Sequence, residues 1–374
     1  MIKRILTVFI FLLLFSVSVS AEEISAEKFY YSQYESAGAD ELKNYLPEET
    51  REYFEKNNID PLKSGWTDSI EPKNVFTHIW GFLKSGAKVP LSAGAVILAI
   101  TLISAALGGM DIKGASSVAM GYAVSLTAAA AIITPIFSVI SASINALQGC
   151  AAFMLAFVPV FAVIVAAMGA TATSLSMSSL LLGACQTVNL IADFVIMPLM
   201  GSYLAISIAS SVSPLIENSG IAGGIKKICY WTMSLLTTVF LGILSIQTAV
   251  NASADTLSLK TAKFIIGSSV PMAGTALSEA LTTVTASMGM LKTTVGIYGV
   301  IACAALFLPL LAELVLWRLT FNLTAVLSDL LSVPKISAVL RSADTVLSVL
   351  IGIILLTAAM FIISLGVVLS AGKV

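Results

Sequence analysis

The sequence predicts an all-α fold: a polytopic transmembrane helix bundle with a small N-terminal helical extracytoplasmic segment. Of its 374 residues, 57% are hydrophobic and only 11% are charged, whereas a soluble globular domain carries about 25% charged residues. The mean hydropathy is +0.97. Several apolar runs also reach the roughly 20 residues that a helix needs to cross a bilayer. A chain with so few ionised side chains needs lipid as its solvent.

Charge is distributed unevenly along the chain. Thirteen of the 21 acidic residues lie between Glu22 and Glu71, and the other eight are spread over the remainder. We therefore divide the chain into a signal peptide at 1–21, an acidic extracytoplasmic segment at 22–88 and a multi-span transmembrane domain at 89–374. The formal net charge is -1 and no basic stripe with interleaved aromatic residues occurs, so the sequence predicts no nucleic-acid partner.

The first 21 residues have the layout of a secretory signal peptide. Lys3 and Arg4 precede an apolar core at 5–15, and the small residues Val19 and Ala21 occupy the positions that a signal peptidase reads. We expect cleavage after Ala21. The alternative is a retained first transmembrane helix, for which the apolar core is short.

The acidic segment is too short for an independent enzyme domain. Pro47 suits the first turn of a helix, and the acidic pair at 48–49 favours the positive end of its dipole. Residues 57–61 predict the turn that ends this helix, and 75–88 predict an amphipathic helix at the membrane interface. His78 is the single histidine and is interpreted as a helix-surface residue.

Apolar windows long enough to span a membrane occur in seven places. They are residues 89–108, 116–140, 147–169, 177–216, 228–250, 294–320 and 344–370. The fourth window is either two spans broken near Pro198 or one helix with an interfacial extension, so the chain has seven or eight spans. Basic residues favour cytoplasmic loops. Two spans in the fourth window place Lys113, Lys226, Lys227, Arg318, Lys335 and Arg341 inside, with the C-terminus outside.

The stretch 251–294 differs from the other apolar sequence, because it is rich in Gly, Ser and Thr and carries several charges. Irregular backbone at membrane depth survives only where protein or water covers it. We therefore expect an interrupted re-entrant or interfacial hairpin, with an ordinary amphipathic surface loop as the alternative. The candidate pore or subunit-contact residues in it are Lys263, Gly267, Pro271, Gly274, Glu279 and Lys292.

Asp193 and Glu313 are the ionisable residues set most deeply in apolar sequence. A carboxylate inside a membrane is costly and usually faces the bundle interior or a cavity. Both are candidate intramembrane polar residues of a transport pathway, and a position at the membrane interface is the alternative for each.

The motifs of common catalytic sites are absent from the sequence. There is no HExxH, no GxSxG and no Walker A loop. The four cysteines lie in apolar stretches without paired spacing, so we interpret them as small buried residues. The sequence therefore predicts no catalytic residue, no metal site and no cofactor, and it does not support an enzyme.

The order of these segments resembles the stage III sporulation protein AE family of endospore-forming bacteria. The resemblance covers nearly the whole chain, and its most specific part runs from Lys263 to Lys292. The residues that carry it are Leu46-Pro47-Glu48-Glu49, Asn58-Ile59-Asp60-Pro61, Lys260-Thr261-Ala262-Lys263-Phe264-Ile265-Ile266-Gly267, Pro271, Gly274, Leu277-Ser278-Glu279-Ala280 and Lys292.

This resemblance implies a multi-pass protein of the mother-cell membrane that surrounds the forespore. It implies a subunit of a secretion-like channel complex that links the two cells and is required for forespore development after engulfment. The implied partners are the other stage III A proteins, including a ring-forming component and an ATPase, together with a forespore-side channel protein. A homo-oligomer within the lipid bilayer is also expected, and the family brings no catalytic residues.

Two other functions remain open at this point. An autonomous secondary transporter or permease for a small solute is the main alternative, because the chain has many spans and the carboxylates Asp193 and Glu313. An intramembrane enzyme is the third hypothesis.

Overall fold

The computed structural model describes residues 26–62, 66, 81, 84, 86–108, 115–212, 219–269 and 274–370. The predicted signal peptide, His78 and most of the predicted amphipathic helix at 75–88 lie outside the described residues. Every described secondary-structure element is a helix. The predicted all-α class is therefore confirmed.

The helices follow one another in an order that separates short N-terminal elements from long apolar ones. The short elements are α2 (Ala26–Ser36), the 3₁₀ helix η1 (Ala39–Tyr45) and α3 (Glu48–Lys56). The long ones are α5 (Lys88–Gly108), α6 (Ala115–Ala167), α7 (Thr171–Ile191), α8 (Met197–Val212), α9 (Ser219–Ser269), α10 (Gly274–Leu330) and α11 (Pro334–Ser370). A π turn, η3 (Ala192–Ile196), joins α7 to α8.

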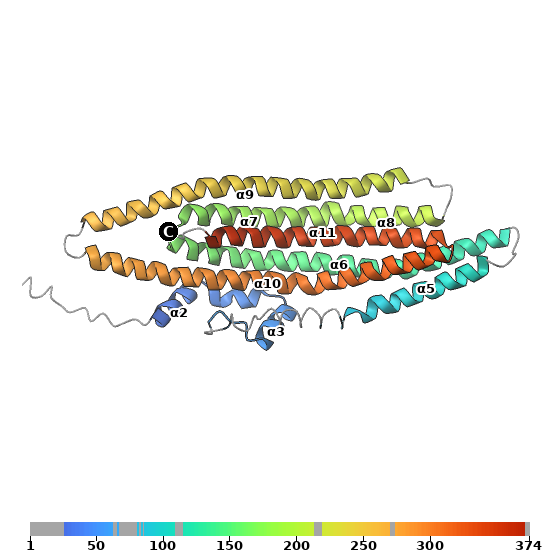
Figure 1. Ribbon diagram of the computed structural model, residues 1–374, viewed down its shortest axis with the longest axis horizontal. Helices are drawn as coiled ribbons and strands as arrows, with labels where there is room; N and C mark the ends of the chain where they lie inside the picture. The colour runs from blue at the N-terminus through green and yellow to red at the C-terminus, as the bar shows by residue number, and fades with distance from the viewer. Residues whose placement is uncertain are drawn as a thin grey trace, which may run out of the picture.

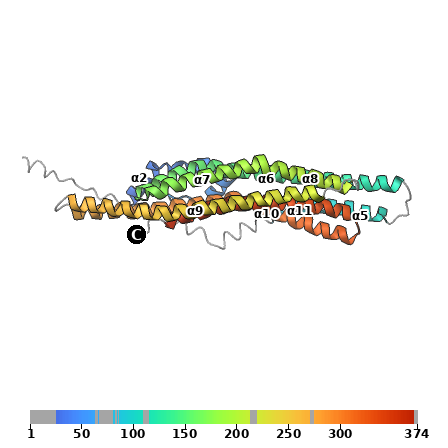
Figure 2. The same ribbon diagram turned by 90° about the horizontal axis from the view of Figure 1, so that it is seen from above.

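The long helices form an elongated bundle of two layers. Helices α6, α7 and α8 lie in one layer, and α9, α10 and α11 lie in the other (Figure 2). We call the end where α10 meets α11, at Leu330 and Pro334, the basal end, and the end where α6 meets α7, at Ala167 and Thr171, the apical end (Figure 1). Helix α5 packs beside α6 and α10 toward the basal end.

The number of spans predicted from the sequence is wrong. Six helices in the described chain are long and apolar enough to cross a membrane. The windows 116–140 and 147–169 belong to the single helix α6. The fourth window is one continuous rod, because the π turn η3 carries α7 into α8 just before Pro198. A proline removes one backbone donor, and the wider π turn accommodates that loss without breaking the rod.

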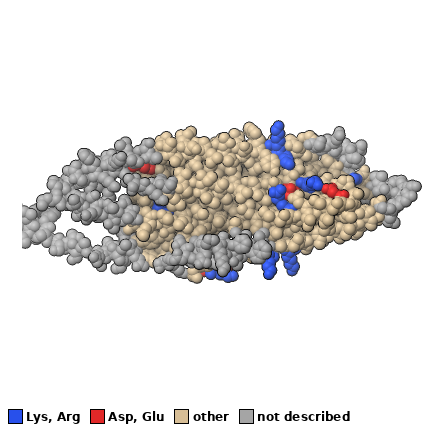
Figure 3. All heavy atoms as spheres, viewed as in Figure 1, with Lys and Arg blue, Asp and Glu red and all other residues tan. Residues whose placement is uncertain are grey.

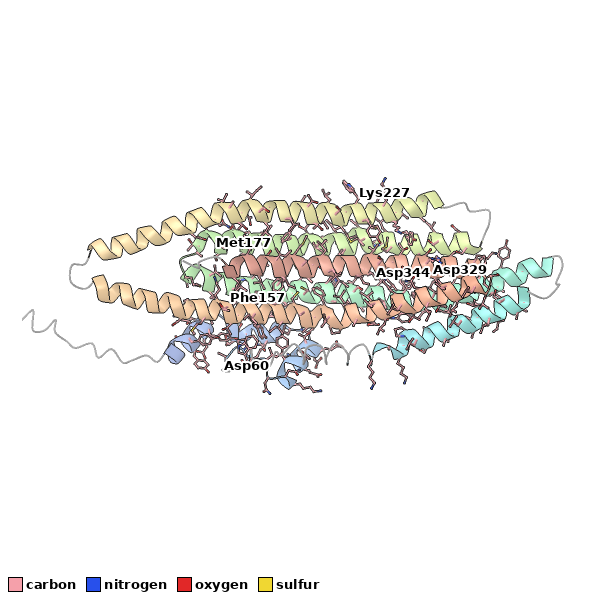
Figure 4. All side chains as sticks on the ribbon, viewed as in Figure 1. Asp60, Phe157, Met177, Lys227, Asp329 and Asp344 are labelled. Carbon is pink, nitrogen blue, oxygen red and sulfur yellow. The ribbon has the colours of Figure 1, made fainter. Side chains whose placement is uncertain are left out.

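Although the predicted count is wrong, the predicted grouping of the loops holds. The ends of α5, α8 and α10 and the starts of α6, α9 and α11 lie toward the basal end, and the end of α11 lies toward the apical end (Figure 1). Two predicted cytoplasmic residues, Lys227 and Arg318, lie in the basal part (Figure 4). The membrane side on which the basal end lies stays a prediction.

Three helices are much longer than a bilayer is thick. Helices α6, α9 and α10 have 53, 51 and 57 residues, which corresponds to about 75–85 Å at 1.5 Å per residue. The hydrocarbon core of a bilayer is about 30 Å thick. Part of each of these helices therefore projects beyond the hydrocarbon core when the helix crosses once.

Local sequence explains where several helices end. Asn58 and Ser332 adopt left-handed φ values of 52° and 61°. The amide of Ile59 donates to the Phe54 carbonyl at 2.9 Å, and the amide of Val333 donates to Ser328 at 2.9 Å. These bonds close a Schellman motif at each helix end. The turn predicted at 57–61 is thereby confirmed.

The acidic N-terminal unit, residues 26–62, has no core of its own and packs against α6 and α10 (Figure 1). The Phe54 ring meets the Tyr298 ring edge-on, with centroids 5.2 Å apart. Gly149 on α6 leaves room for Pro47, which would lie 3.3 Å from a Cβ placed there. The unit therefore covers one flank of the bundle.

The bundle core is built from stacked aromatic and branched side chains. On α6, Phe153, Phe157 and Phe161 stack one above the next at 5.4 Å, and Phe361 of α11 meets Phe157 edge-on at 5.7 Å. Phe157 lies in the bundle interior (Figure 4). A Cβ at Gly299 on α10 would overlap this ring, so glycine permits the close approach of α10 to α6.

Candidate functional site

The stretch 251–294, predicted as a hairpin, forms the end of α9 and the beginning of α10. Residues 251–269 continue α9, and residues 274–294 begin α10. Lys263 and Gly267 lie near the end of α9, and Gly274 and Glu279 lie in the first turns of α10. The side chains of these four residues, and Pro271 as a whole, lie outside the described part of the chain. Whether this stretch enters the membrane, and its role as a pore or contact surface, stay predictions.

Lys292 lies in the bundle interior, and its role as a pore or contact residue stays a prediction. It is 4% exposed, and its Nζ donates a hydrogen bond to the Val368 carbonyl at 3.3 Å. Val368 lies in the last turn of α11, where the carbonyls carry the negative end of the helix dipole. Lys292 therefore fastens α10 to the C-terminal end of α11.

Asp255 is the opposite charge near the same apical end, and the sequence did not single it out. Its carboxylate accepts hydrogen bonds from the Ala172 amide at 2.9 Å and the Thr173 amide at 3.2 Å, and from the Thr173 hydroxyl. These amides form the first turn of α7, which carries the positive end of its dipole. One turn earlier on α9, Asn251 donates to Ser176. The hydroxyls of Thr173 and Ser176 thus bond to α9, and that of Ser174 donates to the Ala162 carbonyl of α6 at 2.6 Å.

Asp193 lies in the π turn η3 and contacts α6. One carboxylate oxygen, Oδ2, accepts a hydrogen bond from Gln148 Nε2 at 3.2 Å. The other, Oδ1, is buried and has no hydrogen-bond partner in the described chain. The flanking Leu190 and Phe194 are 56% and 76% exposed. Asp193 is therefore half-buried where η3 meets α6, and its role in a transport pathway stays a prediction.

Glu313 is held within its own helix. Its Oε1 accepts a hydrogen bond from the Trp317 indole at 3.4 Å. Arg318, five residues later, pairs with Asp344 of α11 at 2.7 Å, and Asn322 donates to the same carboxylate at 2.8 Å. Together with the Arg341–Asp329 pair at 2.6 Å, these contacts staple α10 to α11. The role of Glu313 in a transport pathway stays a prediction.

Most of the described charges of the long helices lie toward the basal part of the bundle. Figure 3 shows Lys and Arg clustered there on the face that it displays, with Asp and Glu beside them. Asp329, Asp344 and Lys227 lie in this part (Figure 4). Lys227 is exposed, with Tyr230 and Trp231 exposed close by on α9. Cations and aromatic rings of this kind favour the boundary between lipid and water.

A row of polar side chains runs along the outside of α6, the helix with one of the most apolar windows in the chain. We call this row the α6 stripe. All of its members are exposed, and they lie within the candidate span Gly121–Ala167. The members are Thr134, Ser138, Ser141, Asn145 and Gln148. Polar groups that face lipid without partners are costly, so protein or water is expected to cover this face.

A second row, of small and hydroxyl residues, continues the α6 stripe along α7. Ser179, Gly183 and Thr187 are exposed at four-residue spacing. The Gln148–Asp193 hydrogen bond joins the two rows where α6 meets η3. Each row rises about 20 Å or less at 1.5 Å per residue, so together they have a length comparable to the hydrocarbon core of about 30 Å. The predicted site residue Asp193 is thus part of a larger feature that the sequence windows did not reveal.

The four cysteines form no disulfide and no metal site among the described residues. All four are free and buried, which confirms their interpretation as small core residues. Among the described residues no cluster of His, Cys, Asp and Glu has the arrangement of a metal site.

Comparison with known proteins supports one family. The family model described as stage III sporulation protein AE matches residues 56–372. A relative from Bacillus subtilis (strain 168), named stage III sporulation protein AE, is 29% identical over 231 residues. This match covers 61% of the present chain and 57% of the relative, so the chain spans somewhat more than half of the curated relative that it matches. No solved structure matches.

Proposed function

We propose that this chain is a membrane subunit of a mother cell–forespore channel complex. The premise is that the chain belongs to the stage III sporulation protein AE family and therefore has a role in sporulation. This secretion-like complex acts in forespore development after engulfment. The chain resides in the mother-cell membrane around the forespore, with its acidic N-terminal unit outside the cytoplasm. Its partners are the other stage III A proteins, including a ring-forming component and an ATPase, and a forespore-side channel protein.

The observation that supports an assembly subunit is the α6 stripe. In a chain that works alone in lipid, exposed amides and hydroxyls on an apolar helix are energetically unfavourable, because lipid offers them no hydrogen bonds. Protein partners, or water held by partners, provide those bonds. The exposed face of α9, in contrast, carries Val239 and Ile246 and suits lipid.

An autonomous secondary transporter has less support. A transporter needs a solute site inside the bundle. A cavity between α6, α7 and α11, lined by Met154, Cys185 and Phe361 among others, has a volume of about 10 Å³, which is room for about one water molecule. Glu313 is bonded to its own helix. Solute movement through the purified chain in liposomes, without any partner, would favour the transporter over the channel subunit.

Complementation of a deletion strain tests the proposal. Deletion is expected to block development after engulfment and to silence late forespore gene expression, and the intact chain is expected to restore both. A chain carrying Asn145→Leu and Gln148→Leu should fail to restore them at an equal level in the membrane. The matched control Val239→Leu, on the exposed face of α9, should restore them. Normal sporulation in the deletion strain would refute the proposal.

A further inference from the structure

We propose that the α6 stripe is the seam through which two copies of this chain associate in parallel, α6 against α6, with Asn145 facing Asn145. This inference deepens the proposed function, on which it rests, by naming the occupant of the exposed polar face. Four features of the described residues carry it: the spacing of the stripe, the size of its side chains, their unused hydrogen bonds and the symmetry of insertion.

The spacing is that of a coiled-coil seam. The exposed positions 134, 138, 141, 145, 148 and 152 alternate by four and three residues, which is the heptad repeat of a and d positions. Ser138, Asn145 and Ala152 then occupy a positions, and Thr134, Ser141 and Gln148 occupy d positions. A repeat of 3.5 residues keeps these positions turned toward a second helix from 134 to 152.

The side chains are small where close packing requires it. Ser138, Ser141 and Ala152 let two helix backbones approach closely, and small residues of this kind mark helix contacts in membranes. The exposed face of α9 differs, because Trp231, Leu235 and Val239 protrude from it. On α6, Phe137 and Leu155 also protrude, each 53% exposed, so the positions that permit close approach are Ser138, Ser141 and Ala152.

The polar groups of the stripe are unsatisfied within one chain. Thr127 and Ser143, elsewhere on α6, donate to the carbonyl four residues earlier at 2.8 Å. Within the described chain, the side chains of Thr134, Ser138, Ser141 and Asn145 form no hydrogen bond, and Gln148 bonds only through Nε2 to Asp193. In lipid each such group costs free energy until a partner arrives.

A second copy can satisfy these groups, because the donors of one copy can pair with the acceptors of the other. An asparagine amide offers both a donor and an acceptor, so two Asn145 side chains related by a two-fold axis satisfy one another. Asparagine at a single a position is also known to select a two-stranded, in-register pair. Copies inserted in the same membrane share one orientation, so a two-fold axis along the bundle brings equivalent residues of α6 together. Asp193 is the one described charge beside the seam, and Gln148 already holds it.

Oxidative cross-linking of the full-length chain in its native membrane tests the seam. Asn145→Cys and Ser138→Cys each put a thiol at an a position, while the four native cysteines are buried. Leu126→Cys gives a control on the same helix, exposed at 55% but outside the a and d positions. Val239→Cys gives a control on α9. We expect at least about five-fold more disulfide-linked dimer from the two seam variants than from either control.

Three outcomes overturn the inference. Modification of Asn145→Cys by a membrane-impermeant maleimide, without dimer, indicates a water-lined face. Cross-linking of Asn145→Cys to a different membrane protein indicates a heterologous partner. As much dimer from the controls as from the seam variants indicates random collision.

A second measurement guards against a poorly folded cysteine variant. In mild detergent, light scattering should show the intact chain and Asn145→Gln as dimers, and Asn145→Leu with at least about ten-fold weaker association. Monomeric intact chain in both detergent and nanodiscs contradicts the seam. If the stripe variants still fail to support sporulation in that case, the proposed assembly role stands and only the identity of the partner is wrong.

Discussion

The two layers of the bundle present outer faces of opposite character. The face of α9 is apolar along most of its length, with Trp231, Leu235, Val239 and Ile246 exposed. The face of α6 carries Asn145 and the rest of the α6 stripe. Both helices are apolar enough to span a membrane, so hydropathy alone does not distinguish them. The difference shows that lipid is the expected cover of one face and protein the expected cover of the other.

Introducing a charge into each face sharpens this comparison most strongly. Val239→Asp should destabilise insertion and folding by about 3 kcal/mol, because it puts a carboxylate against hydrocarbon. Ser141→Asp should cost clearly less, because the α6 stripe already lies among polar groups. The amount of each variant in the membrane fraction and its resistance to unfolding by SDS measure the difference. Equal losses contradict the contrast between the faces.

Substitutions of Asp255 and Asp193 compare a carboxylate that stabilises the fold with one that contributes little to stability. Asp255→Ala should cost about 3 kcal/mol, since it leaves the first amides of α7 buried without their acceptor. Asp193→Asn should change the free energy of unfolding by less than about 1 kcal/mol, because one oxygen accepts a single bond and the other accepts none. Unfolding in a titration of mild detergent with SDS compares the two variants. The reverse order of stability would contradict the assignment of Asp255 to the fold.

Substitutions of two glycines compare the packed interior with the exposed second row on α7. Gly299→Ala should destabilise the bundle by about 2 kcal/mol, because its methyl group overlaps the Phe157 ring. Gly183→Ala meets nothing within 4 Å and should stabilise α7 by up to about 1 kcal/mol. SDS resistance of the purified variants decides the sign of each effect. A loss at Gly183 equal to that at Gly299 indicates that the α7 row is already covered in one chain.

The flank beneath the N-terminal unit is a third surface, and alkaline pH should uncover it. Burial raises the pKa of Tyr34 above its unfolded value of about 10. The docked unit therefore favours the neutral phenol, and this contribution is full below about pH 10 and is lost as pH rises further. Fluorescence of a dye on Glu55→Cys reports release of the unit. Tyr34→Phe should shift release to higher pH, and an unchanged pH profile would count against this role of Tyr34.

Some features were readable from the sequence and others were not. The Pro47 helix start and the turn at 57–61 depend on residues within a few positions of one another, and both were predicted. Asp255 was not singled out, because the amides that it caps lie 82 and 83 residues away. The α6 stripe was missed because the windows 116–140 and 147–169 divided one helix. Its signal, polar residues spaced by four and three, is visible once α6 is known to be continuous.

The sequence by itself determined that the chain is helical and lives in lipid, because backbone amides in hydrocarbon must bond within their own segment and the charged residues for a soluble surface are missing. It also located most of the apolar stretches that the long helices contain. Only the tertiary structure decided which side of each helix faces outward. That choice depends on packing between residues far apart in the chain, such as Phe157 against Gly299 and Gln148 against Asp193. The polar face of α6 follows from that packing and not from its composition.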